Sequence, residues 1–360
     1  MIKNLKVKGL NGRIDLDEDF NSDINLLTGK NGAGKTTILK LIWYLNGAYI
    51  YNLITEINFS EIELVTSTST ITVKKVEQKK ERGFSYEFRV EPDGRTFTVS
   101  ERNIRELEMR HPSLFGHSNN LRDISLPTIF FPTFRRIEGG FSMDSRRNAY
   151  GERTAIKEAL SQLSQILSFN NQRFISSIST DDLVSLVTSE FAKVTEAFNA
   201  LQKEQSEKII KQIRFRNNQN DSELLSSIQS EIISLEETRK QYFQPFTILG
   251  DLIVSIFTHK GIRLSNLTIG DIGNAISSDK LSAGEKQMLS FICYNTFTRD
   301  HIIFIDEPEL SLHPDWQRIL LPTLLKLNNG NQFFMATHSP FIYSKYSDKE
   351  IIIEQDKGDN

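Results

Sequence analysis

Residues 29–36, GKNGAGKT, have the types and spacing of a phosphate-binding loop, because they match G-x-x-x-x-G-K-[ST] at every position. Glycines let the backbone turn its N–H groups around phosphate oxygens without a Cβ in the way, and the following helix adds the positive end of its dipole. Lys35 is expected to reach the β- and γ-phosphates, and the Thr36 hydroxyl to ligate Mg²⁺. A glycine-rich turn that binds nothing is disfavoured, because the stretch follows an apolar strand and opens a helix. No Asn-Lys-x-Asp motif for guanine is present, which favours ATP.

Two adjacent carboxylates, Asp306 and Glu307, follow the apolar run IIFI. Neighbours on a strand point to opposite faces, so one carboxylate could hold a metal while the other faces a different group. Asp306 suits Mg²⁺, usually through water, and Glu307 suits the polarisation of an attacking water. Such a strand end in an arbitrary chain is usually a solvated terminus, but the phosphate-loop pattern favours a functional role here.

His338 follows another apolar run, QFFMA. A lone histidine after a strand is usually a packed or surface residue. In a nucleotide-binding α/β fold it would lie next to the γ-phosphate, where an imidazole can sense whether that group is present.

The stretch LSAGEKQ, residues 281–287, carries the signal for a helix start. Ser282 and Glu285 have the spacing of a capping box, in which each side chain bonds the backbone N–H of the other residue. The capping box gives no reason for Gly284.

The composition limits the other classes of function. The chain has 360 residues, of which 38% are hydrophobic and 25% charged, so it can bury a large core. A net charge of −3 does not suggest an obligate nucleic-acid coat, although it leaves room for a local basic patch. Cys293 is the single cysteine, which excludes a disulfide framework, a zinc hook and a Cys-rich metal site. No apolar run reaches the length of a membrane span and no signal peptide is recognisable, so we expect a cytoplasmic location.

Hydrophobic periodicity indicates an α/β chain with a helical insertion. Period-two alternation predicts strands within 1–28 and an antiparallel sheet over 56–100, and TIFF (128–131) is expected to be a buried strand that stops before Pro132. We therefore expect an N-terminal lobe over 1–150, a helical insertion over 151–245 and a C-terminal lobe over 246–360.

Within the insertion, Asp221 is expected to begin a helix. The side chains expected to face inward from this helix are those of Leu224, Leu225, Ile228, Ile232 and Leu235.

The order of motifs carries a resemblance to a known superfamily. GKNGAGKT, LSAGE, IIFIDEPELSLHP and ATHS resemble the motif series of ABC-type ATPases. The form DEPELSLHP is similar to the SMC, RecF and OLD-like branch, whereas transporter subunits usually read DEPTSALD there. The resemblance covers roughly residues 1–145 and 246–360 and implies an ABC-type (RecA-like) P-loop ATPase head with an antiparallel β subdomain and a helical insertion.

The resemblance also implies roles for individual residues. Lys35, Glu307 and His338 would be catalytic, with Glu307 as the base and His338 as the switch histidine. Thr36 and Asp306 would hold Mg²⁺, and residues 309–313 would form the loop that crosses a dimer. The residues that would bind ATP are Gly29, Lys30, Asn31, Gly32, Ala33, Gly34, Lys35, Thr36 and Thr37, together with Ser282 and Gly284 acting on the nucleotide of another subunit.

One expected feature of these ATPases is not obvious. The loop that places a glutamine before the helical region corresponds to FPTFRRIEGG, with Arg135 and Arg136 where glutamine is expected. These arginines could contact phosphate, contact DNA or pair with carboxylates, and the three alternatives stay open. Arg13 is expected near the nucleotide, as basic residues are in SMC-like heads.

Two absences shape the functional expectation. The insertion is too short for a long SMC-type arm, and the clustered carboxylates of a TOPRIM domain do not follow His338. The opening of the chain and IFFPTFRRIEGGF are most similar to the AriA ATPases of PARIS anti-phage systems. The resemblance therefore implies a regulatory ATPase that assembles with itself and controls a separately encoded effector, such as a TOPRIM-like nuclease of the AriB type, in response to a phage trigger protein.

The alternative is a RecF- or SMC-like repair ATPase that binds DNA directly. Its basic surface would come from Lys211, Arg214 and Arg216, or from Arg135, Arg136, Arg146 and Arg147.

Overall fold

The fold is taken from a computed structural model. The structure describes residues 1–77, 83–101, 103, 121, 123–133, 136–137, 164, 167–168, 171–178, 180–214, 221–257, 281–327 and 329–353. The contacts within the chain divide it into one compact unit of residues 1–178 and 298–360 and a second of residues 179–297.

An antiparallel sheet forms one layer of the first unit. Its strand order is β2-β1-β4-β5-β6-β7. The strands are β1 (Ile2–Leu10), β2 (Ile14–Asp19), β4 (Glu61–Thr66), β5 (Thr70–Glu77), β6 (Phe84–Glu91) and β7 (Arg95–Ser100). Buried and partly buried side chains alternate along β4, as the period-two pattern of EIELVT predicts, so one face of the sheet packs on the core.

A parallel sheet forms the second layer, in the order β10-β8-β12-β13-β3-β14. Its strands are β3 (Ile24–Thr28), β8 (Thr128–Phe131), β10 (Gln172–Phe174), β12 (Ile302–Asp306), β13 (Gln332–Ala336) and β14 (Glu350–Ile352). Every residue of β3, β8, β12 and β13 is buried, as expected for parallel strands covered on both faces. A short parallel pair joins β9 (Arg136–Ile137) to β11 (Ser177–Ile178).

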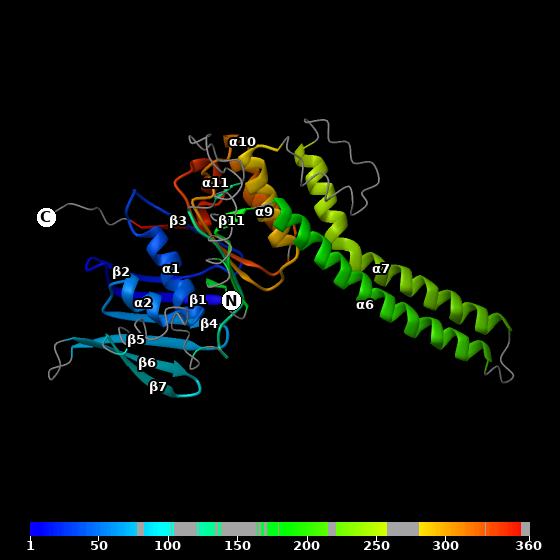
Figure 1. Cartoon of the computed structure of the whole chain (residues 1–360), viewed down its shortest axis with the longest axis horizontal. Coiled ribbons are helices and arrows are strands. Elements are labelled where there is room, and N and C mark those ends of the chain that lie inside the picture. Colours follow the sequence, from blue (N-terminus) through cyan, green and yellow to red (C-terminus); the bar gives the residue numbers. More distant parts are fainter. Residues whose placement is uncertain are drawn as a thin grey trace, which may run out of the picture. The chain divides into compact units, whose positions relative to one another are not determined.

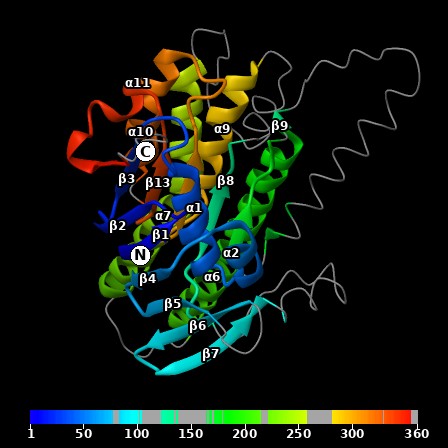
Figure 2. The same cartoon turned by 90° about the vertical axis from the view of Figure 1, so that its left-hand side faces the viewer.

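Helix α1 (Lys35–Asn46) belongs to the same core as both sheets. It contacts β12 and β13, and Figure 2 shows β5, β6 and β7 as a layer on one side of it. Trp43 of α1 is 1% exposed and lies 4.7 to 5.2 Å, between ring centroids, from Tyr49, Phe130 and Phe174. The structure also describes in this unit the helices α2 (Ile50–Glu56), α10 (Pro314–Lys326) and α11 (Pro340–Tyr343) and the 3₁₀ helix η2 (Ser347–Lys349).

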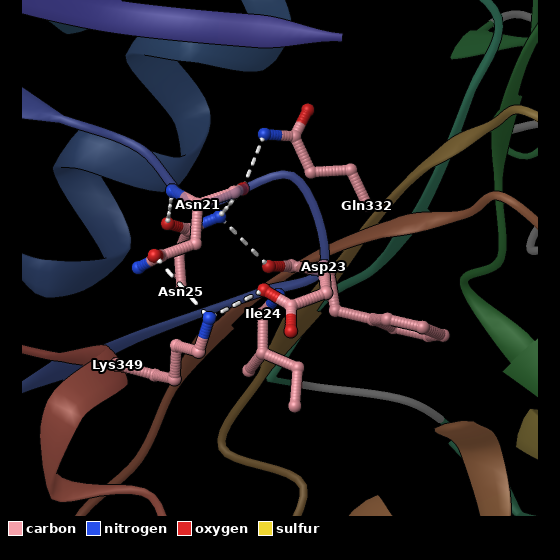
Figure 3. A network of polar contacts seen from close by, with 7 residues as sticks. Asn21, Asp23, Ile24, Asn25, Gln332 and Lys349 are labelled. Carbon is pink, nitrogen blue, oxygen red and sulfur yellow. Dashed lines mark hydrogen bonds and ion pairs between the residues drawn. The ribbon is translucent and has the colours of Figure 1, made fainter. Parts of the chain in front are cut away.

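A buried glutamine joins the two sheets. The Gln332 side chain accepts a hydrogen bond from the Ile2 N–H at 2.8 Å and donates to the carbonyl oxygens of Ile2 and Asn21, each at 2.8 Å. Next to it, Lys349 donates to Asn21 Oδ1 at 3.3 Å and pairs with Asp23 at 3.0 Å (Figure 3). These contacts fix the start of β3 between the strands that flank it.

The second unit is built on two long helices, α6 (Thr180–Arg214) and α7 (Asp221–Phe257). They run side by side (Figures 1 and 2), and Phe191 and Phe198 of α6 meet Phe243 of α7 at 5.5 and 6.0 Å between ring centroids. Helix α9 (Ala283–Thr296) contacts both of them.

The structure confirms the sequence-based fold, including the start of a helix at Asp221. It corrects one part of the expected core, because Leu225 and Ile232 are 67% and 51% exposed. They were expected to face inward, but within the described part of the chain both side chains lie on the surface. The three-part division at residues 150 and 245 stays a prediction; the contacts instead group α9 with the helical insertion.

Candidate nucleotide-binding site

Four neighbouring parallel strands end at one edge of the sheet. In the order β8-β12-β13-β3, they are followed by Thr133, Glu307, His338 and Gly29. The carboxyl ends of parallel strands are the usual place for ligands in open α/β sheets, because the loops that leave them converge there. Chain segments that are about 270 residues apart in the sequence, such as those of Thr36 and Asp306, thereby reach one site.

The loop after β3 needs its glycines for physical reasons. Gly29 has φ 132°, and a Cβ built on it would lie 2.4 Å from the carbonyl oxygen of Ile353. Gly34 has φ 107° and is the N-cap of α1, where a Cβ would lie 2.9 Å from the Ile14 side chain. Both backbone conformations are open to glycine and strained for other residues. The loop therefore leads directly into the first turn of α1, which begins at Lys35, as expected of a phosphate-binding loop.

Lys35 lies under this loop. It is 5% exposed and its ammonium donates hydrogen bonds to the carbonyl oxygens of Gly29 and Lys30 at 3.0 and 3.1 Å. Burial lowers the pKa of Lys35, whereas the carboxylates of Glu307, Asp306 and Glu309 act in the opposite direction. A cation held among acidic groups at a helix N-terminus suits the neutralisation of phosphate charge.

Asp306 is held by two hydroxyl groups. The Thr36 hydroxyl donates to its Oδ1 at 3.0 Å, and the Thr133 hydroxyl donates to its Oδ2. The carboxylate is 1% exposed, so these hydrogen bonds decide its orientation. Thr133 lies two residues after β8, in the stretch where a glutamine was expected, and the sequence analysis missed it. Only the strand order, with β8 beside β12, could have pointed to it.

Glu307 lies just beyond the end of β12 and has φ 47°. A left-handed backbone is uncommon for a non-glycine residue and marks functional sites more often than ordinary loops. The turn brings Glu307 to the same cavity as Lys35 and Thr36. Strand alternation, which we used to separate Asp306 from Glu307, does not apply, because Glu307 is outside the strand.

Glu309 connects this turn to the end of β13. Its carboxylate accepts a hydrogen bond from the backbone N–H of His338 at 2.5 Å and another from the Thr337 hydroxyl at 2.9 Å. Gln317 of α10 supports the same turn, because it accepts from the Ser339 hydroxyl at 2.5 Å and donates to the Leu312 carbonyl at 2.8 Å. His338 is thus fixed through its backbone while its side chain stays exposed. His313, which follows this turn, is the N-cap of α10.

The residues enclose a cavity of about 670 Å³. Arg13 lines it and donates to the Gly32 carbonyl at 2.9 Å, and its expected place near a nucleotide stays a prediction. Glu309 and Leu310, from the stretch 309–313 that was expected to cross a dimer, line it as well. Asn11 also lines it, and no sequence pattern had indicated that residue. The predicted residues along its wall are Asn31, Gly32, Gly34, Lys35, Thr36, Thr37, Glu307 and His338. Gly29, Lys30 and Ala33 belong to the loop without lining the cavity, and Asp306 lies beneath Thr36.

The oxygen groups at this site fit a hard divalent cation. Within the described residues, no cluster of three or more His, Cys, Asp or Glu side chains is suited to hold a metal on its own. Mg²⁺ usually takes only one or two protein oxygens and completes its octahedron with phosphate oxygens and water. The Thr36 hydroxyl and the buried Asp306 carboxylate are a set of that kind.

The signature-like stretch lies in the second unit. Ser282 is the N-cap of α9 and forms the predicted capping box, in which Glu285 accepts from the Ser282 N–H at 2.7 Å and donates its own N–H to Ser282 Oγ at 3.4 Å. Glu285 is buried and takes part in this capping box, and a contact with a second subunit stays a prediction. Gly284 is in the first turn of α9, and its role toward a second subunit stays a prediction.

The basic residues considered for DNA binding are described only in part. Arg136 is in β9, and Lys211 and Arg214 are in the last turn of α6. Arg135, Arg146, Arg147 and Arg216 lie outside the described residues.

Residues 24–344 match a family model described as "AAA domain, putative AbiEii toxin, Type IV TA system". The chain is 22% identical over 363 residues to the "Retron Vc95 probable ATPase" of Vibrio cholerae serotype O1 biovar El Tor, which covers 91% of this chain and 68% of that protein. It is 47% identical over 45 residues to the "Septu protein PtuA" of Bacillus thuringiensis, covering 12% of this chain and 11% of that protein. It is 35% identical over 79 residues to the "Retron Ec83 probable ATPase" of Escherichia coli, covering 18% and 15%.

Among solved structures, the chain is similar to an Smc head domain with an extended coiled coil bound to the C-terminal domain of ScpA, from Pyrococcus furiosus. That match has 15% identity, covers 95% of this chain and 91% of that chain, and has a TM-score of 0.34, below the level at which a shared fold would follow. No helix among the described residues is long and apolar enough to cross a membrane.

Proposed function

This chain belongs to the family of AAA domains of the AbiEii toxin type, and on that premise we propose that it is an ATP-binding and ATP-hydrolysing regulatory subunit of a prokaryotic anti-phage defence system. The observation that carries the proposal is the meeting of Lys35, Thr36, Glu307 and His338 on one cavity, with Asp306 bound to Thr36 beneath it. The defence setting is supported by the motif resemblance and by similarity to proteins named as retron ATPases and a Septu protein.

Each residue has a role that its position supports. The loop of residues 29–34 and the N-terminus of α1 would bind the β- and γ-phosphates, with Lys35 neutralising their charge. Thr36 and Asp306 would hold Mg²⁺, which would supply positive charge to offset the negative charge that develops on the phosphates. Glu307 would accept a proton from the attacking water, and His338 would bind the γ-phosphate from the other side of the cavity.

We expect hydrolysis to need a second copy. Ser282 and Gly284, at the exposed start of α9, would contact the γ-phosphate of ATP held by that copy. The finer proposal is an AriA-like ATPase that restrains a separately encoded TOPRIM-like nuclease until a phage trigger protein binds.

The proposal is tested with Glu307→Gln beside Glu87→Gln, a matched change at an exposed position on β6. Glu307→Gln should keep ATP binding, lose turnover and accumulate an ATP-bound assembly, because the base is removed and the phosphate contacts are kept. Glu87→Gln should behave as the wild type. Equal turnover in all three proteins would overturn the assignment of the base. Failure of the ATPase to co-purify with the product of a neighbouring gene, together with protection by the ATPase alone, would overturn effector control.

The second candidate is a DNA-binding repair ATPase of the RecF or SMC type. The last turn of α6 favours it, because Lys211 and Arg214 are both exposed there. Binding through phosphate contacts must weaken steeply as salt rises. Absence of DNA binding at low salt, with and without ATP, would eliminate this candidate.

A further inference from the structure

Exposed apolar side chains gather where α6 ends and α7 begins. Ile210 and Ile213 of α6 are 47% and 51% exposed, and Leu225, Ile232 and Ile233 of α7 are 67%, 51% and 52% exposed. Large aliphatic side chains are normally found singly on the surface of a protein, and a contiguous group marks an interaction site. Five of them in these two segments therefore need a reason.

The register between α6 and α7 shows which way these side chains point. The pairs Phe191–Phe243 and Phe198–Tyr242 establish an antiparallel arrangement. The hydrogen bond to Glu204 is the main cause of the raised pKa of Lys208, and Glu231 of α7 is close enough to contribute to it. Continued by one residue, the same register sets Ile209 opposite Ser230, so that Ile209 and Ile228 lie within one turn of each other. Both are partly buried, so they define the seam between the helices.

Most of the exposed residues lie on the same side of that seam. At about 100° per residue, Ile210 and Ile213 are displaced from Ile209 by about 100° and 40° in one sense, and Leu225 and Ile232 from Ile228 by about 60° and 40° in the same sense. Because the helices are antiparallel, equal senses of rotation lead to one common face of the pair. We call Ile210, Ile213, Leu225 and Ile232 the apolar face of the hairpin.

The charges of the two helical segments differ in sign. The end of α6 carries mainly basic residues, Lys203, Lys208, Lys211 and Arg214, against Glu204 and Glu207. The first half of α7 is acidic and has no basic residue before Arg239; its charges are Asp221, Glu223, Glu231, Glu236 and Glu237.

From these observations we infer that the apolar face of the hairpin binds the same face of a second copy of this chain, independently of nucleotide. A two-fold axis along the hairpin brings the two faces together and sets α6 of each copy against α7 of the other, as in an antiparallel four-helix bundle. The basic helix then meets the acidic helix twice, and the four apolar residues of each copy are covered. A single acidic or basic partner would complement only one of the two helices.

Lys203 and Glu236 give this arrangement a specific contact. By the same rotation they lie about 120° and 80° from the seam, on the side of the apolar face, and both are exposed. Opposite Lys203 the register set by Lys208 and Glu231 reaches Glu236 itself. Lys203 of one copy is therefore expected to pair with Glu236 of the other.

The experiment measures self-association of the full chain by analytical ultracentrifugation, without nucleotide and with a chelator, so that association through the nucleotide sites does not contribute. Wild type should form dimers. Ile232→Glu should raise the dissociation constant by about 100-fold, because the two-fold axis repeats the loss of apolar contact. Ser234→Glu, two residues away on the opposite flank of the same helix and also exposed, should leave it unchanged.

A mixing experiment tests the pairing of the helices. Lys203→Glu and Glu236→Lys should each weaken self-association about tenfold, and an equimolar mixture of the two should recover the wild-type affinity. A monomeric wild type, an equal effect of Ile232→Glu and Ser234→Glu, or no recovery on mixing would each refute the inference. If the wild type is monomeric and binds DNA, and Lys203→Glu abolishes that DNA binding, the surface would instead be assigned to nucleic acid. None of these outcomes depends on ATP hydrolysis, so the inference can fail while the proposed function stands.

Discussion

Removal of one hydroxyl group next to Asp306 should disable metal binding without touching the phosphate loop. Thr133→Val replaces a hydroxyl by a methyl group of nearly the same size, so the packing is kept and the hydrogen bond to Asp306 Oδ2 is lost. The carboxylate is 1% exposed, and water cannot easily replace the lost donor. A hydrogen bond to a charged group contributes about 1.5 to 3 kcal/mol, which corresponds to a loss of affinity of roughly 10- to 150-fold for a metal that needs this orientation.

Electron paramagnetic resonance of Mn²⁺ gives a direct reading, since free and bound Mn²⁺ are distinguished in the presence of a non-hydrolysable ATP analogue. Thr133→Val should weaken Mn²⁺ binding within that range, Thr133→Ser should restore it, and Thr36→Val should weaken it at least as much. Binding of a fluorescent ATP analogue, measured with a chelator present so that no metal contributes, should have the same affinity in all variants. Mn²⁺ affinity of Thr133→Val within twofold of wild type, while Thr36→Val is impaired, would show that Thr133 does not position Asp306.

Three further predictions follow from the same contacts. Lys35→Ala should abolish binding of a fluorescent ATP analogue, whereas Lys40→Ala, an ion-paired residue of the same helix, should bind as wild type; retained binding by Lys35→Ala would contradict the phosphate role. Gln332→Leu should lower the free energy of unfolding by about 3 kcal/mol in urea titrations, because backbone groups of Ile2 and Asn21 lose their partners, and a loss no larger than that of Lys349→Ala would refute this. Burial raises the pKa of Cys293 to about 12, so a disulfide reagent should modify this thiol only after unfolding. The stability linked to the thiol is full below its pKa in the unfolded chain and is lost as pH rises toward 12. Rapid labelling of the native protein at neutral pH would contradict this prediction.

Much of the fold follows from periodicity and punctuation in the sequence. The alternation of EIELVT gives β4, the uninterrupted apolar runs give β3, β12 and β13, and Pro132 ends β8 as expected. These elements are local, so their residues carry enough information to specify them. The capping box of Ser282 and Glu285 is local in the same sense, and the structure contains it.

What the sequence could not supply depends on which strands are neighbours. Thr133 has no motif of its own, and its contact with Asp306 exists because β8 lies beside β12. Glu309 bonds the backbone of His338 because β12 lies beside β13. Periodicity also failed for Leu225 and Ile232, since an apolar stripe tells which residues avoid water without telling what covers them.

The place of β3 in the sheet has a consequence for the synthesis of this protein. Its neighbours are β13 and β14, and both come from residues 332–352, whereas β3 itself is made within the first thirty residues. On the ribosome, the strand that carries the phosphate loop has no place in its sheet until more than three hundred further residues have been translated. A nascent or prematurely terminated chain therefore lacks the neighbours of β3, and the apolar β3 segment has no partner strands until the sheet closes late.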